Sequence, residues 1–572
     1  MIVPMKHLTL LCVADAGEKT LAALRDLGCV HVDLSGASSA AFAAARGELA
    51  EAERAVRILS KAAAEAKGGA SVAADGRFDS VRNADLVAAV LAADAERQAA
   101  AEEAEALRQT VRAYEPYGDF DPALAQSLLD RGVDLSSVCT LPDPLPRERL
   151  SATRARLAAA QAKVASLAAA LASANGRAGA ILAAYPGLND RIAFEAARDA
   201  LATQGAVSWI EGWIPAESVP RLRAQAVTRG WGLLLRDAEP GENPPTLIRP
   251  PRLFRPVAAL FQGLGIAPAY SEADVSVPFM CYFSVFFAML VGDGAYGAIF
   301  LAATLFGWWK TRPKGEGHRP RIIRSWLTML TVFSFATVVW GVLSNTWFGA
   351  GIPACADWPT VKWLADPSYG NMMLLCFTIG ASHLMLARIW NGICRLPDST
   401  AIAEFGWAGV LLFMYLVTNS IVGIFAGIPS WAFAVFGVSL VSVFGFSVKP
   451  SELKTRGAEL GMLPLNIMSA LGDIISYVRL FAVGLASVKV AENFNAMATG
   501  LVAGEGAVWV KALLSVAMVL ILVVGHGLNL AMAGLSILVH AVRLNTLEFS
   551  NHKGVSWAGY AFRAFARKAS DE

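Results

Sequence analysis

The sequence predicts a mainly α-helical protein in two parts. The first is an N-terminal cytosolic dumbbell, in which an antiparallel coiled coil joins two small α/β lobes, and the second is an eight-helix transmembrane domain with two long tilted C-terminal helices. Up to about residue 270 the chain is rich in Ala, Arg, Glu and Asp, and beyond it long apolar runs carry few charges. Two Ala-rich segments of the first part also repeat apolar residues every seven positions. We therefore expect a cytosolic domain over 1–270 and a transmembrane domain over 271–572.

A proximal α/β lobe is expected from both ends of the first part. MKHLTLLCVA and CVHVDLS predict two strands on either side of a helix at about 17–27. The later segments AVSWIEGWIPAESVPRL and GWGLLLRDAEP predict a strand that leads into a helix and then a further strand. We assign this lobe to residues 1–36 together with 205–250.

Two heptad repeats predict the antiparallel coiled coil, which pairs residues 40–66 with 147–183. Its apolar positions are seven residues apart in each helix: Phe42, Leu49, Val56 and Ala63 in the first, and Leu150, Leu157, Val164 and Leu171 in the second. The intervening segment 67–146, with a third helix at 84–113, is expected to form the distal lobe. An Ala-rich helical domain that is not a rod fits the same periodicity.

Eight apolar segments predict the membrane helices, at about 278–291, 293–309, 325–348, 371–390, 403–426, 430–447, 462–494 and 508–543. Basic residues gather in KTRPKGEGHRPRIIR, in VKPSELKTRGAEL and at Lys553, Arg563, Arg567 and Lys568, which favours the cytosol for these segments and for both termini. The first two segments meet at GDGAYG, either in one long helix or in a hairpin. The last two exceed about 45 Å, so they must tilt, bend or project.

Several functions are excluded by what the sequence lacks. The formal net charge of +2 gives no reason to expect a nucleic-acid partner, and the seven scattered cysteines contain no Cys-x-x-Cys pair. AGEKT lacks the first glycine of a phosphate-binding loop, and no zinc-protease, nucleophile-elbow or dinucleotide motif is present. We therefore expect no cofactor, no metal and no enzymatic activity of the chain alone. The N-terminus has no secretory signal, and the Ala/Arg-rich composition favours a multi-pass protein of the bacterial inner membrane.

Arg479, within DIISYVRLFAVGLASV, is the most unusual residue of the membrane half. An arginine in mid-membrane costs roughly 2.5–3.5 kcal/mol, so such residues usually have a function. Asp473 is a poor partner because it lies about 120° away around the helix. Small residues at Gly472 and Ala486 share the side of Arg479, so we expect another helix, with its own carboxylate, to approach there.

The final helix carries a polar stripe that consists of His526, Asn529, Ser536, His540 and Arg543. Their spacings of 3, 7, 4 and 3 keep these side chains on one helical face, which is typical of a helix that lines water or packs on another polar helix. Glu492 and Glu548 lie near opposite helix ends, where they are either part of an ion path or solvated boundary charges.

LGDIISYVRLFAVGLA and SILVHAVRLNTLEFSNHKG resemble the last two transmembrane helices of the membrane stator subunit of V-type and archaeal A-type rotary ATPases, called subunit I in bacteria and subunit a in eukaryotes. WIEGWIP, PPT and PAYSEAD followed by GDGAYG agree with the same family, and the resemblance spans the chain. It departs at Ser487, where many relatives carry His, at Ala533, where some carry Glu, and at Asn545, where His or Gln is frequent.

The resemblance implies that Arg479 is the essential stator arginine and Arg543 its companion, both facing the buried carboxylates of a rotating proteolipid ring (c/K subunits). The ion path against the ring would then include Asp473, Ser476, Tyr477, Ser487, Glu492, His526, Asn529, Ser536, His540 and Glu548. Peripheral stalk subunits of the E/G type would bind the cytosolic lobes, and the A/B head would hydrolyse or synthesise ATP. The coupling ion, H⁺ or Na⁺, is left open. A standalone ion-coupled transporter or channel is the alternative, and it would give the coiled coil no role.

Overall fold

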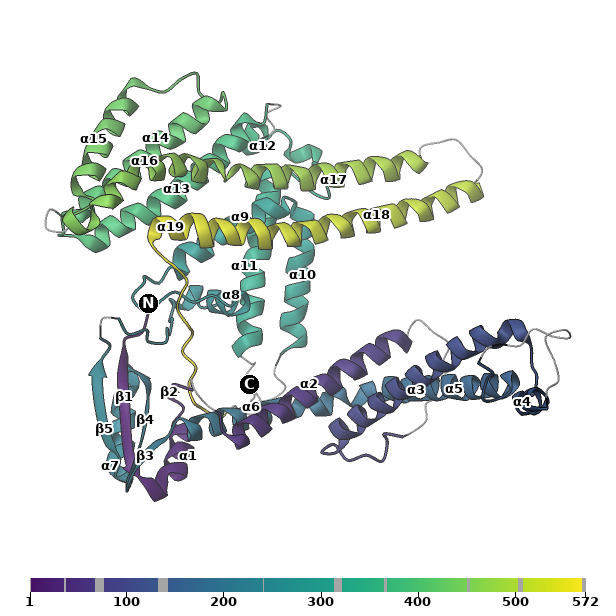
Figure 1. The fold of residues 1–572 in the computed structure, drawn as a ribbon. Helices are drawn as coiled ribbons and strands as arrows, with labels where there is room; N and C mark the ends of the chain where they lie inside the picture. Colours follow the sequence, from purple (N-terminus) through teal and green to yellow (C-terminus); the bar gives the residue numbers. More distant parts are fainter. Residues whose placement is uncertain are drawn as a thin grey trace. The chain divides into compact units, whose positions relative to one another are not determined.

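The computed structural model describes residues 2–34, 38–66, 77–131, 142, 144–239, 241–312, 321–364, 368–449, 453–502 and 508–567. These residues are mostly helical and divide into two compact units (Figure 1). One unit comprises Met1–Lys6 and Asp237–Arg563, and the other His7–Arg236 and Ala564–Glu572. We call them the membrane unit and the N-terminal unit. The chain therefore passes between the units three times. The boundary predicted at residue 270 stays a prediction.

A five-stranded sheet forms one end of the N-terminal unit, with strand order β2-β4-β1-β5 and β3 paired with β4. Its strands are β1 (Met5–Val13), β2 (His31–Val32), β3 (Ala202–Gln204), β4 (Val207–Pro215) and β5 (Gly232–Asp237). Helices α1 (Gly17–Leu27) and α7 (Val219–Arg229) contribute to the same core. Alternate residues of β1 are buried there, as the period-2 pattern of a half-buried strand requires. Phe565, from the C-terminal tail, is also part of this core, and its N–H donates to the carbonyl of Val30.

Four long helices make up most of the rest of the N-terminal unit (Figure 1). They are α2 (Ala40–Ala66), α3 (Leu86–Tyr114), α5 (Leu150–Ala174) and α6 (Ala178–Asp199). Helix α2 packs against both α5 and α6, and α3 packs along α5. The long helices are Ala-rich, and small side chains such as Ala52, Ala55 and Ala93 are buried between them. The dumbbell, with its coiled-coil rod, stays a prediction.

The predicted distal lobe differs from an α/β lobe in the part that is described. Residues 77–131 form α3, the short turn Glu115–Tyr117 and α4 (Pro122–Asp130), with no strand among them. Asp121 caps α4 by accepting from the N–H groups of Ala123 and Leu124. Residues 67–76, 132–141 and 143 of the predicted lobe lie outside the described residues.

The membrane unit begins with α8 (Val257–Leu264), α9 (Ser276–Val291), α10 (Gly294–Lys310) and α11 (Arg321–Ser344). Residues 278–309, which could have been one helix, are two: α9 ends at Gly292, whose φ of +71° is left-handed and favours glycine. Asp293 then caps α10 through the N–H of Ala295. The basic loop 313–320 lies outside the described residues, as do 450–452 and Lys568.

The later helices of this unit are α12 (Pro359–Leu364), α13 (Gly370–Arg395), α14 (Thr400–Ile421), α15 (Ser430–Phe446), α16 (Leu453–Ile475), α17 (Val478–Val502), α18 (Val508–Ser536) and α19 (Ser550–Lys553). Helices α17 and α18 lie side by side along most of their length (Figure 1). A core of Phe, Leu, Met and Tyr side chains from α9, α13, α14 and α16 holds the unit together.

Six helical segments of the described chain are long and apolar enough to cross a membrane. Five are in the membrane unit: Ile322–Ser344, Gly370–Arg395, Thr400–Ile421, Leu460–Val502 and Trp509–Lys553. The sixth, Leu150–Asp199, comprises α5 and α6, which the sequence assigns to the cytosol. Helices α9 and α15 are apolar but shorter. The membrane part is thus supported, while the count of eight crossings stays a prediction.

Candidate functional site

Arg479 lies just after a break in the helix that the sequence predicted to be continuous over 462–494. Helix α16 ends at Ile475 and α17 begins at Val478. The N–H groups of Tyr477, Arg479 and Leu480 each donate to the carbonyl three residues earlier, at 3.1, 3.3 and 3.0 Å, so the chain makes a tight 3₁₀ turn here. The hydroxyl of Ser476 donates to the carbonyl of Asp473 at 2.7 Å, a local bond that competes with the regular helix.

Tyr477 packs this break in the helix against α13. Its side chain is fully buried, and its hydroxyl lies 2.9 Å from Nδ1 of His383 on α13. The His383 ring is in turn stacked between Tyr282, with centroids 4.0 Å apart, and Phe549, at 4.4 Å. Gly380 leaves the space that the Tyr477 ring occupies, since a Cβ there would lie 2.5 Å from Tyr477 Cγ. The backbone beside Arg479 is therefore tightly packed.

Glu548 is an acidic partner for Arg479 within this chain. The resemblance assigned the partner carboxylate to the rotating ring, outside this chain. Oε1 of Glu548 lies 3.5 Å from Nη1 of Arg479 and 3.4 Å from Nε of Arg543. The Glu548 side chain is only 6% exposed, whereas those of Arg479 and Arg543 are 26% and 53% exposed. The buried carboxylate therefore faces two guanidinium groups that both reach the protein surface. The chain thus supplies one carboxylate partner of Arg479 itself, and the expected ring carboxylate stays a prediction.

Wide helical turns explain why the pairing of Glu548 with Arg543 was not predicted. The final helix changes to π-helical turns at Ile537–Ala541 and Leu544–Phe549. In an α-helix, residues five apart differ by about 140° in direction, so Arg543 and Glu548 would diverge. The i→i+5 bonding of a π-turn brings such residues close to one face. The same turns interrupt the 3.6-residue period on which the predicted polar stripe rests.

A network of charged side chains, most of them buried or half-buried, begins at Asp473, six residues before Arg479 in the chain. Oδ2 of Asp473 lies 3.0 Å from Nε2 of His552, and Nε of Arg388 lies 3.1 Å from the other ring nitrogen of that histidine. Arg388 also pairs with Glu404 at 3.2 Å, and Glu404 pairs with Arg395 at 2.9 Å. We call Asp473, His552, Arg388, Glu404 and Arg395 the charged network.

Two neighbours complete the charged network. Asn391 donates to the carbonyl of His552 and accepts a hydrogen bond from Lys553 at 2.6 Å. The guanidinium of Arg388 also lies over the Trp407 ring, 4.9 Å from its centroid. Each buried charge in this network therefore has a partner, as burial requires.

A neutral hydrogen-bonded network lies on the other side, eight residues beyond Arg479. The Ser487 hydroxyl lies 3.1 Å from Oδ1 of Asn529, whose amide donates to the Ser487 carbonyl at 2.9 Å and to the Tyr296 hydroxyl at 3.1 Å. That hydroxyl is 2.7 Å from Nδ1 of His526, and Nε2 of His526 is 3.1 Å from Oδ1 of Asn495. We call Ser487, Asn529, Tyr296, His526 and Asn495 the neutral network.

The structure therefore brings together three predicted residues, Ser487, His526 and Asn529, and adds Tyr296 and Asn495. It does not join the other predicted residues to them. Ser536 is half-buried, and its hydroxyl has no hydrogen bond to another described residue. The Nδ1 atom of His540 is buried and likewise unpartnered there.

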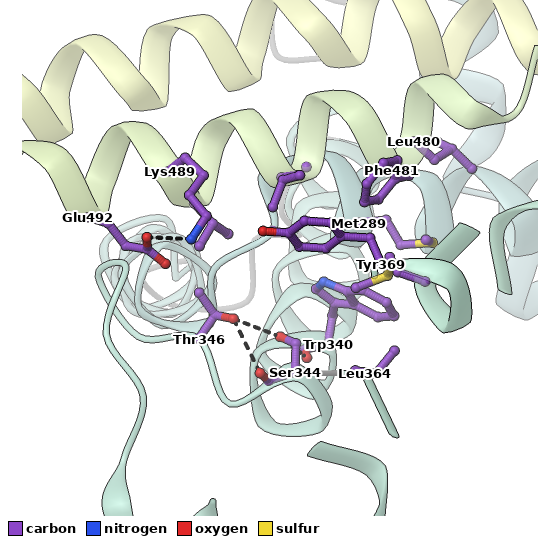
Figure 2. Close-up of a pocket in the computed structure, with 15 residues that line it drawn as sticks. Met289, Trp340, Ser344, Thr346, Leu364, Tyr369, Leu480, Phe481, Lys489 and Glu492 are labelled. Carbon is purple, nitrogen blue, oxygen red and sulfur yellow. Dashed lines mark hydrogen bonds and ion pairs between the residues drawn. The ribbon is translucent and has the colours of Figure 1, made fainter. Parts of the chain in front are cut away.

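Glu492 lies apart from Arg479, at a cavity of about 350 Å³ between α9, α11, α13 and α17 (Figure 2). It pairs with Lys489 at 2.7 Å, and both side chains are more than 40% exposed. Such an exposed pair contributes about 0–1 kcal/mol. The cavity is lined by the face of α17 that includes Leu480, Phe481 and Val488, which is opposite to the face of Arg479. Trp340, Ser344, Thr346 and Tyr369 line its other side (Figure 2).

His383, Arg388, Glu404 and Tyr296 were missed by the sequence reasoning, although a signal was available. His383 and Arg388 lie in the apolar segment 371–390, and Glu404 opens the next one. The argument that polar residues inside apolar helices are costly applies to them as it does to Arg479. His552 and Asn495 gave no such signal, because they lie beyond the predicted apolar segments 462–494 and 508–543.

Comparison with known proteins gives relatives along the whole chain. V-type ATP synthase subunit I of Borreliella burgdorferi is 32% identical over 63% of this chain and 60% of its own length. V-type ATP synthase subunit I 1 of Treponema pallidum is 27% identical over 99% of this chain and its own full length. A-type ATP synthase subunit I of Methanocaldococcus jannaschii is 24% identical over 60% of this chain and 52% of its own length. No protein-family model matches the chain.

Proposed function

This chain is a homologue of the subunit I proteins of V-type and A-type ATP synthases, and from this premise we propose that it is the membrane stator of such a rotary complex. In this role it forms two ion half-channels against a rotating proteolipid ring and couples the passage of H⁺ or Na⁺ to ATP hydrolysis or synthesis. The chain itself is a non-catalytic membrane subunit, so the ATP chemistry belongs to the A/B head.

One observation carries the proposal: Arg479 and Arg543 converge on buried Glu548 while both guanidinium groups remain partly exposed. A positive charge at the surface of a membrane helix favours the ionised form of a carboxylate that approaches it. A ring carboxylate that arrives at Arg479 therefore releases its bound ion. The guanidinium also blocks a direct ion leak, because a cation beside it is repelled.

The two networks are the natural half-channels in this proposal. The charged network begins at Asp473, six residues before Arg479, and the neutral network begins at Ser487, eight residues after it. Each consists of side chains that bond to one another, and the arginine pair lies between them along the helix. An ion could thus reach the ring from one side and leave on the other, with the ring rotation as the only connection.

Glu548 has a specific part in this mechanism. It holds the two guanidinium groups when no ring carboxylate is close, because an unpaired buried charge is costly. The contacts of 3.4 and 3.5 Å are longer than a good charge-assisted hydrogen bond of about 2.7–2.9 Å, so they leave Arg479 available to a better-placed ring carboxylate. The arginine therefore exchanges an internal partner for an external one at each step of rotation.

The partners follow from the same proposal. The ring is a set of c/K-type proteolipid subunits, and the lobes of the N-terminal unit bind peripheral stalk subunits of the E/G type, which hold the A/B head against torque. The membrane is the bacterial inner membrane, with both termini in the cytosol and eight crossings. The alternative of a standalone transporter or channel is not favoured by relatives that are named as ATP synthase subunits.

Replacement of Arg479 by Ala in the assembled complex tests the proposal. We expect ATP-driven ion uptake into vesicles to be lost while the complex assembles in normal amount. The matched control is Arg312→Ala, at the exposed end of α10, which should pump normally. Pumping that survives in a normally assembled Arg479→Ala complex would exclude the stator role, and ion flux through the purified single chain would favour the transporter.

A further inference from the structure

A second basic surface of the membrane unit lies away from Arg479, at the beginning of α11. A groove of about 890 Å³ runs between the segment 252–262 and the first turns of α11. Its polar lining consists of Arg252, Arg255, Gln262, Arg324, Ser325 and Thr328, and its remaining lining residues are apolar. No acidic side chain lines it within the described chain. We call it the arginine groove.

The three arginines of the groove are exposed, and their guanidinium groups have no hydrogen bond or ion pair with any described residue. This sets them apart from Arg388 and Arg395, which share Glu404. Three like charges around one groove repel one another unless an anion lies between them. The arrangement therefore has the charge of an anion site, with planar donor groups that suit phosphate oxygens.

The residues around the groove indicate that it lies at the boundary between lipid headgroups and hydrocarbon. The membrane-crossing segment Ile322–Ser344 begins within the groove. Large apolar side chains at its rim are exposed, with Leu253 at 71% and Ile322 at 58%. Trp326 packs against the backbone of α8, since a Cβ on Gly263 would lie 3.2 Å from its ring. An exposed tryptophan beside arginines is typical of the boundary between headgroups and hydrocarbon.

We propose that the arginine groove binds the headgroup of an anionic phospholipid. The lipid phosphate lies among Arg252, Arg255 and Arg324, and its acyl chains extend along Ile322 and Trp326 toward the bilayer. Basic pockets beside transmembrane helices are known to suit such headgroups. An acidic protein segment fits the charge but not the exposed apolar rim. This site is independent of ion translocation, so it stands even where the stator proposal fails.

Binding of phosphatidylglycerol to the purified full-length chain, counted by native mass spectrometry, tests the proposal. The triple variant R252Q/R255Q/R324Q should bind it roughly 100-fold more weakly, because each basic residue near a membrane surface contributes about 1 kcal/mol. The triple variant with Lys at the same positions keeps the charge and should retain most of the binding. Phosphatidylcholine should bind weakly to all of them.

The matched control removes three exposed arginines of the N-terminal unit, as R54Q/R112Q/R223Q, and should bind phosphatidylglycerol as the wild type does. Size-exclusion profiles establish that each variant is folded, and R324Q alone serves if the triple variant is not. Equal binding of phosphatidylglycerol by the wild type and the groove variant would refute the site. Full competition by inorganic phosphate or by poly-glutamate would equally overturn a lipid as its ligand.

Discussion

Glu548 and Arg479 face each other at 3.5 Å between the last two long helices, although they are 69 residues apart in the chain. The carboxylate is almost fully buried, and its second oxygen, Oε2, has no hydrogen-bond partner among the described residues. A buried acceptor without a partner is costly, so the interaction of Oε1 with two guanidinium groups must offset that cost. In the proposed mechanism, a better-placed ring carboxylate would draw Arg479 away from this contact.

Substitution of Glu548 by Gln should weaken ion pumping by roughly tenfold, since hydrogen bonds to charged groups contribute about 1.5–3 kcal/mol. The neutral amide no longer holds the guanidinium groups of Arg479 and Arg543 in position. Fewer ring carboxylates would then meet a correctly placed guanidinium group. ATP-driven ion uptake, divided by ATP hydrolysis in the same vesicles, measures the effect. Asp357→Asn, at an exposed pair with Lys362, is the control. Wild-type pumping in Glu548→Gln would show that Glu548 does not hold the arginines.

Gly380→Ala should destabilise the membrane unit by about 1–3 kcal/mol, the usual cost of overpacking. The new methyl group would meet the Tyr477 ring and move the turn that precedes Arg479. Thermal unfolding of the purified chain, with pumping by the complex, measures both consequences. Gly437→Ala on α15 is the matched control, because nothing lies within 4 Å of its Cβ. If both variants unfold alike, the packing of Tyr477 on Gly380 is not what positions the turn.

Tyr296→Phe should reduce pumping, because it removes the hydroxyl through which Asn529 and His526 are connected. The loss should be close to that of His526→Gln. A Tyr296→Phe/His526→Gln double variant should pump little less than either single variant, since residues in one network have non-additive effects. Initial rates of ATP-driven uptake measure this. Effects that simply add would mean that the two side chains act separately.

The start of α2 should become less stable as the pH falls below about 4. The Asp199 carboxylate accepts hydrogen bonds from the backbone N–H groups of Ser39 and Ser38, which holds its pKa below the usual value. A lowered pKa means that the stabilisation is present above the unfolded-state pKa and is lost as the pH falls through the folded-state pKa. Hydrogen exchange of the amides at 38–43 between pH 6 and pH 3 measures it. Asp199→Asn should remove this pH dependence.

Local patterns were sufficient for most helices and failed where distant residues decide the structure. Apolar runs predicted α9, α10, α11, α13, α14 and α15 to within about five residues, while α12 lies in a segment expected to be a loop. The heptad segment 40–66 coincides with α2. The break at Tyr477 depends on His383 and Gly380 of another helix, so no local period could indicate it. The π-turns likewise shift Glu548 toward Arg543 against the 3.6-residue period.

The candidate site was predictable only as separate residues. Arg479 and Arg543 stood out because a charge in an apolar helix is costly, and Asn529 and His526 stood out by their spacing. Their bonding partners could not be predicted, because the neutral network joins α10, α17 and α18 through contacts of residues up to 233 positions apart. Asp473 was judged only against Arg479 on its own helix, whereas its partner is His552.

The three passages of the chain between the two units have a mechanical consequence. A body joined to its neighbour by one flexible linker swivels freely, because rotation about a few single bonds meets little resistance. The three passages, near residues 6, 236 and 563, give any load between the units three backbone paths instead of one. Because Phe565 is packed in the core of the N-terminal unit, the C-terminal passage of the chain is fixed at its end and can carry part of such a load.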